Sequence, residues 1–252
     1  MNAEERQRAI LEAVQVRGKV TTADLSHRFG VSEMTVRRDI AQLDQDGALR
    51  RVHGGAARSG SGSFEPPFAL RSRLHAEAKR NIASDVAAAL TDGQTVILDG
   101  GTTGVAIAEA LAGRDLTVCT MSMRVAEILS SSPGGQVMLT GGTIRPGELS
   151  LVGAAAARTL DDHRFDVYVM TVSGADADAG LTEWNTEDAA VKRAALAASA
   201  RRVVACDSSK FGQVAFARIC PLSAADLFVT DAGLSPEQRS KILTSGIELH
   251  VA

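Results

Sequence analysis

Residues 31–57 read VSEMTVRRDIAQLDQDGALRRVHGGAA and begin with a strong helix signal. Ser32 is a preferred N-cap residue, and the acid Glu33 follows in the first turn, where the helix dipole favours negative charge. Val36, Ile40 and Leu43 fall within one narrow arc of the same helix. The stretch therefore predicts a helix over residues 32–45 that buries one face and carries two arginines on or beside the other.

Two further helices are expected upstream of this one, and a hairpin downstream. Residues 4–17 repeat apolar positions at helical spacing and end at Gly18, and residues 22–29 form a shorter helix that stops at Gly30. Residues 49–53, followed by a pair of glycines, indicate a short β-hairpin. Helices and hairpin in this order predict a winged helix-turn-helix, in which the hairpin is the wing.

A helix-turn-helix places the N-terminal half of its second motif helix in the DNA major groove, where arginine can bridge the O6 and N7 acceptors of guanine. Residues 1–58 hold ten Lys and Arg against eight Asp and Glu, whereas the whole chain has a formal net charge of −3. A contact with double-stranded DNA therefore belongs to this part. We expect it to use Ser32, Thr35, Arg37, Arg38, Arg51 and His53.

The alternative for this part is a small helical module for protein contact. In that case Arg37 would pair with a nearby acid, such as Asp39 or Glu33, instead of facing DNA.

Residues 56–67 are small, polar and bounded by proline, which is linker composition. We expect a DNA-binding domain over residues 1–57, a linker over 58–75, and a domain for effector sensing and oligomerisation over 76–252. Coupling between the two domains is expected to run through a helix from about residue 69 to residue 90.

Strand-like apolar segments alternate with helical intervals after residue 76. The segments are 95–98, 116–120, 136–140, 166–171, 202–207, 227–230 and 247–251. This alternation predicts an α/β fold with a mostly parallel sheet covered by helices.

Glycine-rich turns follow several of these strands, namely DGGTT at residues 99–103, TGG at 140–142 and SGA at 173–175. Ligands of open α/β sheets bind at the carboxyl ends of the strands, so these turns are expected to converge on one pocket. Backbone amides at glycines and the positive end of the following helix suit an anion such as a phosphate. Glycine turns also serve packing alone, and a rim lysine can be merely solvated.

We expect a small-molecule effector to contact residues that follow the strands. They are Asp99, Gly100, Gly101, Thr102, Thr103, Thr120, Ser122, Gly141, Gly142 and Lys210.

Composition excludes several classes of protein. Apolar residues make up 45% of the 252 residues and charged residues 23%, which is typical of globular chains, and no apolar run approaches membrane-spanning length. The first residues lack a secretory signal, so we expect a cytoplasmic protein. The three cysteines lie far apart and are expected to be reduced thiols, and the scattered histidines predict no metal or other cofactor.

The VSEMTVRRDIAQLDQDGALRRVHGG stretch strongly resembles the DeoR family of bacterial regulators. The resemblance continues through DGQTVILDGGTT at residues 92–103, EDAAVKRAAL at 187–196 and DSSKFG at 207–212. It implies a transcriptional regulator, most often a repressor of a carbohydrate-catabolic operon, that responds to a phosphorylated sugar or related metabolite. The family usually has Asn where this chain has Met121, which implies an altered or less polar ligand.

The α/β part also resembles ribose-5-phosphate isomerase, through a GAD element that ends at Asp176 and a DSSK element that ends at Lys210. The resemblance adds Asp176 to the expected effector contacts. The lysine-plus-glycine loop that such isomerases need is replaced by GLTEWN at residues 180–185, and Val191 stands where a glutamate is expected. We therefore predict a binding site and no enzyme activity.

Two rival functions remain at this point. One is a sugar-phosphate isomerase or deaminase with an accessory DNA-binding head, and the other is a constitutive DNA-binding protein whose second domain only assembles it. Trp184 could line the effector pocket or simply pack, and Glu183, Asn185 and Glu187 share that ambiguity. A homo-oligomer, either dimer or tetramer, is expected to place two recognition helices in successive major grooves.

Overall fold

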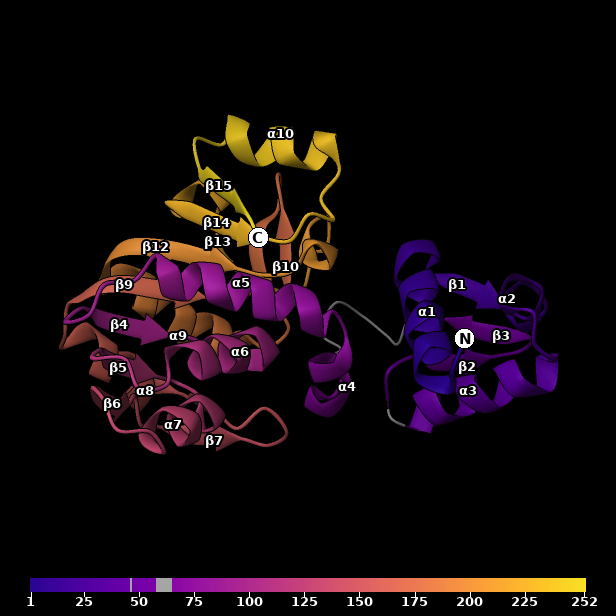
Figure 1. Ribbon diagram of the computed structural model, residues 1–252, viewed down its shortest axis with the longest axis horizontal. Helices are drawn as coiled ribbons and strands as arrows, with labels where there is room; N and C mark the ends of the chain where they lie inside the picture. Colours follow the sequence, from indigo (N-terminus) through magenta and orange to yellow (C-terminus); the bar gives the residue numbers. More distant parts are fainter. Residues whose placement is uncertain (46, 58–64) are drawn as a thin grey trace. The chain divides into compact units, whose positions relative to one another are not determined.

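A computed structural model describes residues 1–45, 47–57 and 65–252 of the chain. The chain divides into two compact units, Met1–Leu74 and His75–Ala252, which Figure 1 shows in indigo to purple and in magenta to yellow. Of the linker expected over residues 58–75, residues 58–64 lie outside the described residues. No helix of the described chain is long and apolar enough to cross a membrane.

The N-terminal unit is a winged helix-turn-helix, as expected. Its helices are α1 (Ala3–Arg17), α2 (Thr22–Phe29), α3 (Glu33–Gln45) and α4 (Phe68–Arg73). Strands β1 (Lys19–Thr21), β3 (Gly55–Ala57) and β2 (Arg50–Val52) form an antiparallel sheet in that order, so the wing hairpin β2–β3 gains a third strand that the sequence did not reveal.

The N-terminal unit is held together by an apolar core and one buried ion pair. The predicted stripe of Val36, Ile40 and Leu43 is almost wholly buried. Beside it, the guanidinium of Arg6 in α1 binds the Asp39 carboxylate of α3 with two hydrogen bonds, of 2.5 Å from Nε and 3.1 Å from the terminal nitrogen. Hydrogen bonding to Asp39 raises the pKa of Arg6. Asp39 is therefore a structural residue, and it does not pair with Arg37.

The segment expected as one helix from residue 69 to residue 90 is two helices. Helix α4 ends at Arg73, and α5 (Ala76–Ala88) starts after His75, whose φ of 53° lies in the left-handed region. Leu70 and Leu74 pack against the core of the N-terminal unit. The helix breaks at this point because Leu70 and Leu74 pack against the N-terminal core, whereas the apolar residues of α5 pack in the core of the C-terminal unit.

The C-terminal unit contains a seven-stranded parallel sheet, which confirms the predicted fold class. Its strands are, in spatial order, β15 (Glu248–Val251), β14 (Leu227–Thr230), β12 (Ser199–Ala205), β9 (Phe165–Met170), β4 (Thr95–Leu98), β5 (Thr117–Thr120) and β6 (Gln136–Leu139). Each strand coincides closely with one of the seven predicted segments.

Helices cover both faces of this sheet because side chains alternate along each strand. In β4, Val96 and Leu98 pack under α5, α6 (Gly101–Leu111) and α7 (Met123–Ser130), and Figure 1 shows α5 and α6 side by side over the sheet. Ile97 points to the opposite face, where α8 (Ala154–Asp161), α9 (Thr186–Ala197) and α10 (Pro236–Thr244) pack.

The order of the strands defines a switch point between β4 and β9. The chain proceeds from β4 outward through β5 and β6, and then returns to β9 on the other side of β4, from where it continues through β12 and β14 to β15. Connections on the two sides of this point diverge, and ligands of open α/β sheets bind at the carboxyl ends of the strands at such a point.

Smaller strands lie outside the main sheet and were not foreseen. The hairpin β7 (Thr143–Arg145) and β8 (Ser150–Val152) follows β6, and β10 (Gly174–Asp176), β11 (Gly180–Glu183) and β13 (Ala217–Cys220) form an antiparallel sheet. The turns η1 (Ser208–Lys210) and η2 (Leu222–Ala224) flank β13. The hairpin joins the main sheet at its carboxyl edge, where Ser150 bridges to Ser122.

We expect Gly55→Ala to separate β1 from the wing. A Cβ atom at Gly55 would lie 2.0 Å from the carbonyl oxygen of Val20, so the strands must move apart, at a cost of about 3 kcal/mol. Gly54→Ala is the matched control, because Gly54 has a φ of 73° but open space around it, and costs about 1 kcal/mol of backbone strain. Hydrogen exchange of the amides of residues 19–21 and 50–57 measures both. Equal protection in the two variants would contradict the expected steric clash.

Candidate functional site

The exposed start of α3 carries the residues expected to contact DNA. Ser32 precedes the helix and accepts a hydrogen bond of 3.2 Å from the backbone N–H of Thr35, while the two hydroxyls lie 3.0 Å apart. Arg37 forms a 2.6 Å ion pair with Glu33, one turn earlier on the same helix. The side chain of Arg38 is exposed, and no hydrogen bond or ion pair joins its guanidinium to another described residue. Of the two arginines in α3, Arg38 is therefore the one whose donors are available to a ligand.

The wing supplies the remaining predicted DNA contacts. Arg51 lies in β2 and His53 in the turn between β2 and β3, and both side chains are exposed. The backbone N–H of Arg51 donates a 2.9 Å hydrogen bond to the Asp44 carboxylate near the end of α3. This bond ties the wing to α3.

The predicted effector residues at the ends of β4 and β5 come together. Gly100 lies so close to Ser122 that a Cβ atom there would be 3.0 Å from the Ser122 Cβ. Ser122 caps α7, and its backbone N–H donates a 3.1 Å hydrogen bond to the Thr120 hydroxyl. Thr102 and Thr103 are buried in the first turn of α6. These residues form one continuous patch beside the switch point.

The N-terminus of α6 has the features of an anion site. No side chain among the described residues caps this helix, whose N-cap is Gly100. Gly101 has a φ of 72°, which glycine adopts without strain, and the first amides of the helix follow it. The positive end of the helix dipole and these donors favour a negatively charged group.

A buried ionic cluster underlies this patch at the switch point. The ammonium of Lys192, from α9, lies 2.9 Å from Asp99 and 2.6 Å from Glu183, and it donates a 2.8 Å hydrogen bond to the carbonyl oxygen of Thr171. Asp99 also accepts hydrogen bonds from the Gly100 and Thr171 amides, of 2.7 and 3.1 Å. One lysine thus joins the ends of β4 and β9 to β11.

The electrostatics of the cluster follow from its burial and its pairing. Burial alone would lower the pKa of Lys192, but Asp99 and Glu183 more than offset it, so the pKa lies well above its ordinary value. Burial alone would raise the pKa of Glu183, but Lys192 and hydrogen bonds from Ser173 and the Trp184 amide hold it below its ordinary value. Lys192 is therefore protonated and Glu183 deprotonated at neutral pH, so the two form a buried ion pair beside Asp99.

A second buried pair connects the β7–β8 hairpin to α9. Arg145 of β7 lies 2.7 Å from Asp188, near the start of α9. Burial raises the pKa of Asp188, and the Arg145 guanidinium offsets part of this effect. The hairpin is thereby fixed beside the helix that carries Lys192.

The other predicted effector residues lie farther from this patch. Gly141 and Gly142 follow β6, and Gly142 packs closely against the Val152 carbonyl of β8. Lys210 lies beyond β12, two strand positions from β4, and no hydrogen bond or ion pair joins its amine to another described residue. Asp176 ends β10 and accepts hydrogen bonds from the amides of the turn that follows it.

Sequence reasoning did not assign Lys192, Thr171 and Ser173 to the site and left Glu183 undecided. A signal was present, because Lys192 falls on the buried face of α9 with Ala189, Ala195 and Leu196. A lysine at such a position requires buried partners.

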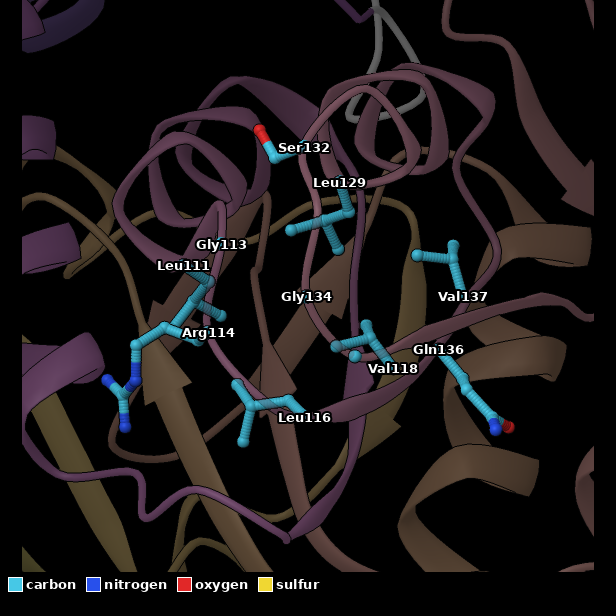
Figure 2. Close-up of a pocket in the computed structure, with 11 residues that line it drawn as sticks. Leu111, Gly113, Arg114, Leu116, Val118, Leu129, Ser132, Gly134, Gln136 and Val137 are labelled. Carbon is cyan, nitrogen blue, oxygen red and sulfur yellow. The ribbon is translucent and has the colours of Figure 1, made fainter.

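A hollow elsewhere in the C-terminal unit has a different character. Figure 2 shows it lined by Leu111, Leu116, Val118, Leu129 and Val137, with the polar ends of Arg114 and Gln136 directed away. Its volume of about 20 Å³ accommodates about one water molecule. It lies before β5 and β6, at the opposite ends of these strands from the patch, so it does not extend the candidate site.

Comparisons with known proteins agree over both units. Residues 6–61 match the model of a DeoR-like helix-turn-helix domain, and residues 74–232 match that of a DeoR C terminal sensor domain. The uncharacterized HTH-type transcriptional regulator YgbI of Escherichia coli K12 is 37% identical over 240 residues, which cover 95% of this chain and 93% of the relative. The glycerol-3-phosphate regulon repressor of the same organism is 33% identical and covers 92% of each chain.

Among solved structures, ribose 5-phosphate isomerase A from Methanocaldococcus jannaschii superposes with a TM-score of 0.42 and 12% identity. The superposition covers 54% of this chain and 55% of the isomerase.

Removing the central cation should destabilise the C-terminal unit in a pH-dependent manner. Lys192→Met leaves Asp99 and Glu183 buried without a counter-charge, and we expect the free energy of unfolding to fall by about 3–5 kcal/mol at pH 8. Urea unfolding followed by the fluorescence of Trp184, the only tryptophan of the chain, measures this unit alone. The control Lys241→Met removes an exposed partner of Glu237 and should change little.

The sign of the pH dependence distinguishes this explanation from a simple packing defect. In the unmodified chain Glu183 has a lowered pKa, so its contribution is complete above the ordinary pKa and is lost as the pH falls through the lowered value. In Lys192→Met, burial is no longer offset by the ammonium and raises the pKa of Glu183, so the deficit should shrink between pH 8 and pH 5. A deficit independent of pH would show that the cluster is not ionised as described.

Proposed function

This chain belongs to the DeoR family of transcriptional regulators, and on that basis we propose that it represses a carbohydrate-catabolic operon until a phosphorylated sugar or related metabolite binds it. The observation that carries the proposal is the combination, in one chain, of an exposed arginine on a helix-turn-helix with an uncapped helix N-terminus at the ends of a parallel sheet. One relative is named as the repressor of a glycerol-3-phosphate regulon, which supports this class of effector. The protein would act in the cytosol.

The proposed DNA contacts fall into two groups. Arg38 bridges the O6 and N7 atoms of a guanine, because its donors are uncommitted and it projects from the N-terminal half of α3. Ser32, Thr35 and Arg37 with Arg51 and His53 of the wing hold the phosphate backbone, which fixes the register of the helix in the groove. The ion pair with Glu33 restrains Arg37 and suits it to a phosphate more than to a base edge.

The proposed effector site combines an anion end with a polar floor. The amides and hydroxyls of residues 100–103 would bind the phosphate, and Thr120 and Ser122 lie beside them. Asp99 holds the Gly100 turn. In this proposal Gly141 and Gly142 would line the loop after β6, and Lys210 and Asp176, which lie farther away, would contact the other end of the ligand.

Control of DNA binding requires more than ligand contact. The effector must bind more tightly to the arrangement of the DNA-binding domains that binds DNA poorly. Equal affinity for both arrangements would leave their populations unchanged. A homodimer or tetramer would place two α3 helices in successive major grooves, and the operator would then be a repeat or palindrome with half-sites spaced by helical turns.

The rival function, a sugar-phosphate isomerase or deaminase with an accessory DNA-binding head, is disfavoured by the cluster chemistry. Lys192 has its donors committed to Asp99, Glu183 and Thr171 and its pKa is raised, so it is a poor proton acceptor. Incubation of the protein with pentose and hexosamine phosphates tests this point, and robust turnover would overturn the sensor assignment.

We expect Arg38→Ala to weaken binding to the promoter of the chain's own gene by about 1–3 kcal/mol and to relax the preference at one base pair. Arg17→Ala, which removes an exposed arginine from α1, is the control and should bind nearly as the unmodified chain. Fluorescence anisotropy over a range of salt concentrations measures both, and affinity should fall steeply with added salt. A uniform loss on all sequences would instead assign Arg38 to a phosphate.

We expect Lys210→Ala to weaken binding of the effector by about tenfold, through loss of a charged hydrogen bond. The readout is Trp184 fluorescence together with thermal shift, across a panel of sugar phosphates that includes glycerol 3-phosphate. Lys241→Ala removes an exposed lysine from α10 and should leave the affinity unchanged. Absence of any response to the whole panel would favour the constitutive regulator whose second unit only assembles it.

A further inference from the structure

Met34 is an exposed apolar side chain in the first turn of α3. It has 63% of its surface exposed, and among the side chains described in the N-terminal unit only Met1 is a comparably exposed large hydrophobic residue. The other apolar residues of α3, Val36, Ile40 and Leu43, are at most 1% exposed. Water contact at this position is unfavourable for a thioether side chain, so the exposure calls for an explanation.

Helix geometry directs the Met34 side chain away from the core. Residues two apart on an α-helix point about 200° away from each other, so Met34 faces away while Val36 is buried. Residues four apart lie on the same face, which makes Arg38 the neighbour of Met34 on the outer surface. Met34 and Arg38 therefore project together from the half of the helix that enters a major groove.

The polar side chains around Met34 are bound to one another. The Ser32 and Thr35 hydroxyls lie 3.0 Å apart, and Glu33 forms its ion pair with Arg37. These pairs flank Met34, so its thioether is the apolar group that this part of the helix offers to a ligand.

We propose that Met34 recognises the C5-methyl group of a thymine in the operator, close to the base pair that Arg38 reads. This proposal rests on the DNA-binding role proposed above. The thymine methyl is the apolar group that the base pairs present in the major groove, and a flexible thioether adapts to it readily.

The position of the thymine follows from the helix. Four residues at a rise of ~1.5 Å separate Met34 from Arg38 by ~6 Å along the axis. Successive bases of one strand are ~3.4 Å apart, so the thymine should lie within about two base pairs of the guanine. Removal of one methyl contact corresponds to an about fourfold loss of affinity, and removal in both half-sites to about 15-fold.

The test replaces single thymines with deoxyuridine in an operator fragment mapped by footprinting on the promoter of the chain's own gene. Deoxyuridine lacks only the methyl group and keeps every hydrogen-bonding group of thymine. Anisotropy titrations compare the full-length chain with Met34→Ala and Met34→Gln. We expect one thymine per half-site at which deoxyuridine weakens the unmodified chain about fourfold and leaves both variants unaffected.

Two control variants separate this contact from general weakening. Met123→Ala removes an exposed methionine from the C-terminal unit and should keep the full sensitivity to deoxyuridine. Arg38→Ala should keep that sensitivity while losing discrimination at its own guanine. Circular dichroism verifies that each variant is folded.

Two results would overturn the proposal, and they are distinguishable. If the chain binds the operator but no thymine shows a loss that the Met34 variants abolish, Met34 does not read a methyl group and the DNA-binding role stands. If the chain binds no duplex from its own promoter at low salt, the proposed function itself fails, and this contact fails with it.

Discussion

One buried ammonium group joins the strand ends at the centre of the C-terminal unit. Lys192 reaches from α9 to the ends of three strands, where it binds Asp99, Glu183 and the Thr171 carbonyl oxygen. An isolated buried charge costs several kcal/mol, so burial of the ammonium and the two carboxylates is tolerated only because they are paired with one another. Asp99 in turn accepts a hydrogen bond from the Gly100 backbone N–H, and this bond orients the turn before α6. The conformation of the turn before α6 thus depends on a buried ion cluster.

The same cluster is poorly suited to acid–base chemistry. General acid–base catalysis requires a group whose pKa lies near the operating pH and whose proton can reach the substrate. The pKa of Lys192 is displaced away from neutrality, and its donors are occupied. The groups that stay available at the strand ends are backbone amides, hydroxyls and the Lys210 amine, which suit recognition of an anion more than proton transfer.

The sequence predicted what depends on local patterns. Cap residues and helical spacing located α1, α2 and α3, and apolar runs located every strand of the parallel sheet. The hairpin β7–β8 and the sheet containing β10 were missed because strands of three or four residues carry little periodicity. Which strand ends meet depends on the spatial order of the strands, so the neighbours of Asp99 could not be inferred. Lys192 was missed because a lysine in an alanine-rich helix is ordinarily solvated.

The first residues of the C-terminal unit lie within electrostatic reach of the end of β12. Burial alone would raise the pKa of Asp207 at the end of β12, but the charges of Lys210, His75 and Lys79 hold it below its ordinary value. His75 directly follows Leu74, which packs in the N-terminal core. An anion bound by Lys210 would change the charge balance around Asp207 and therefore act on the residue that begins the C-terminal unit.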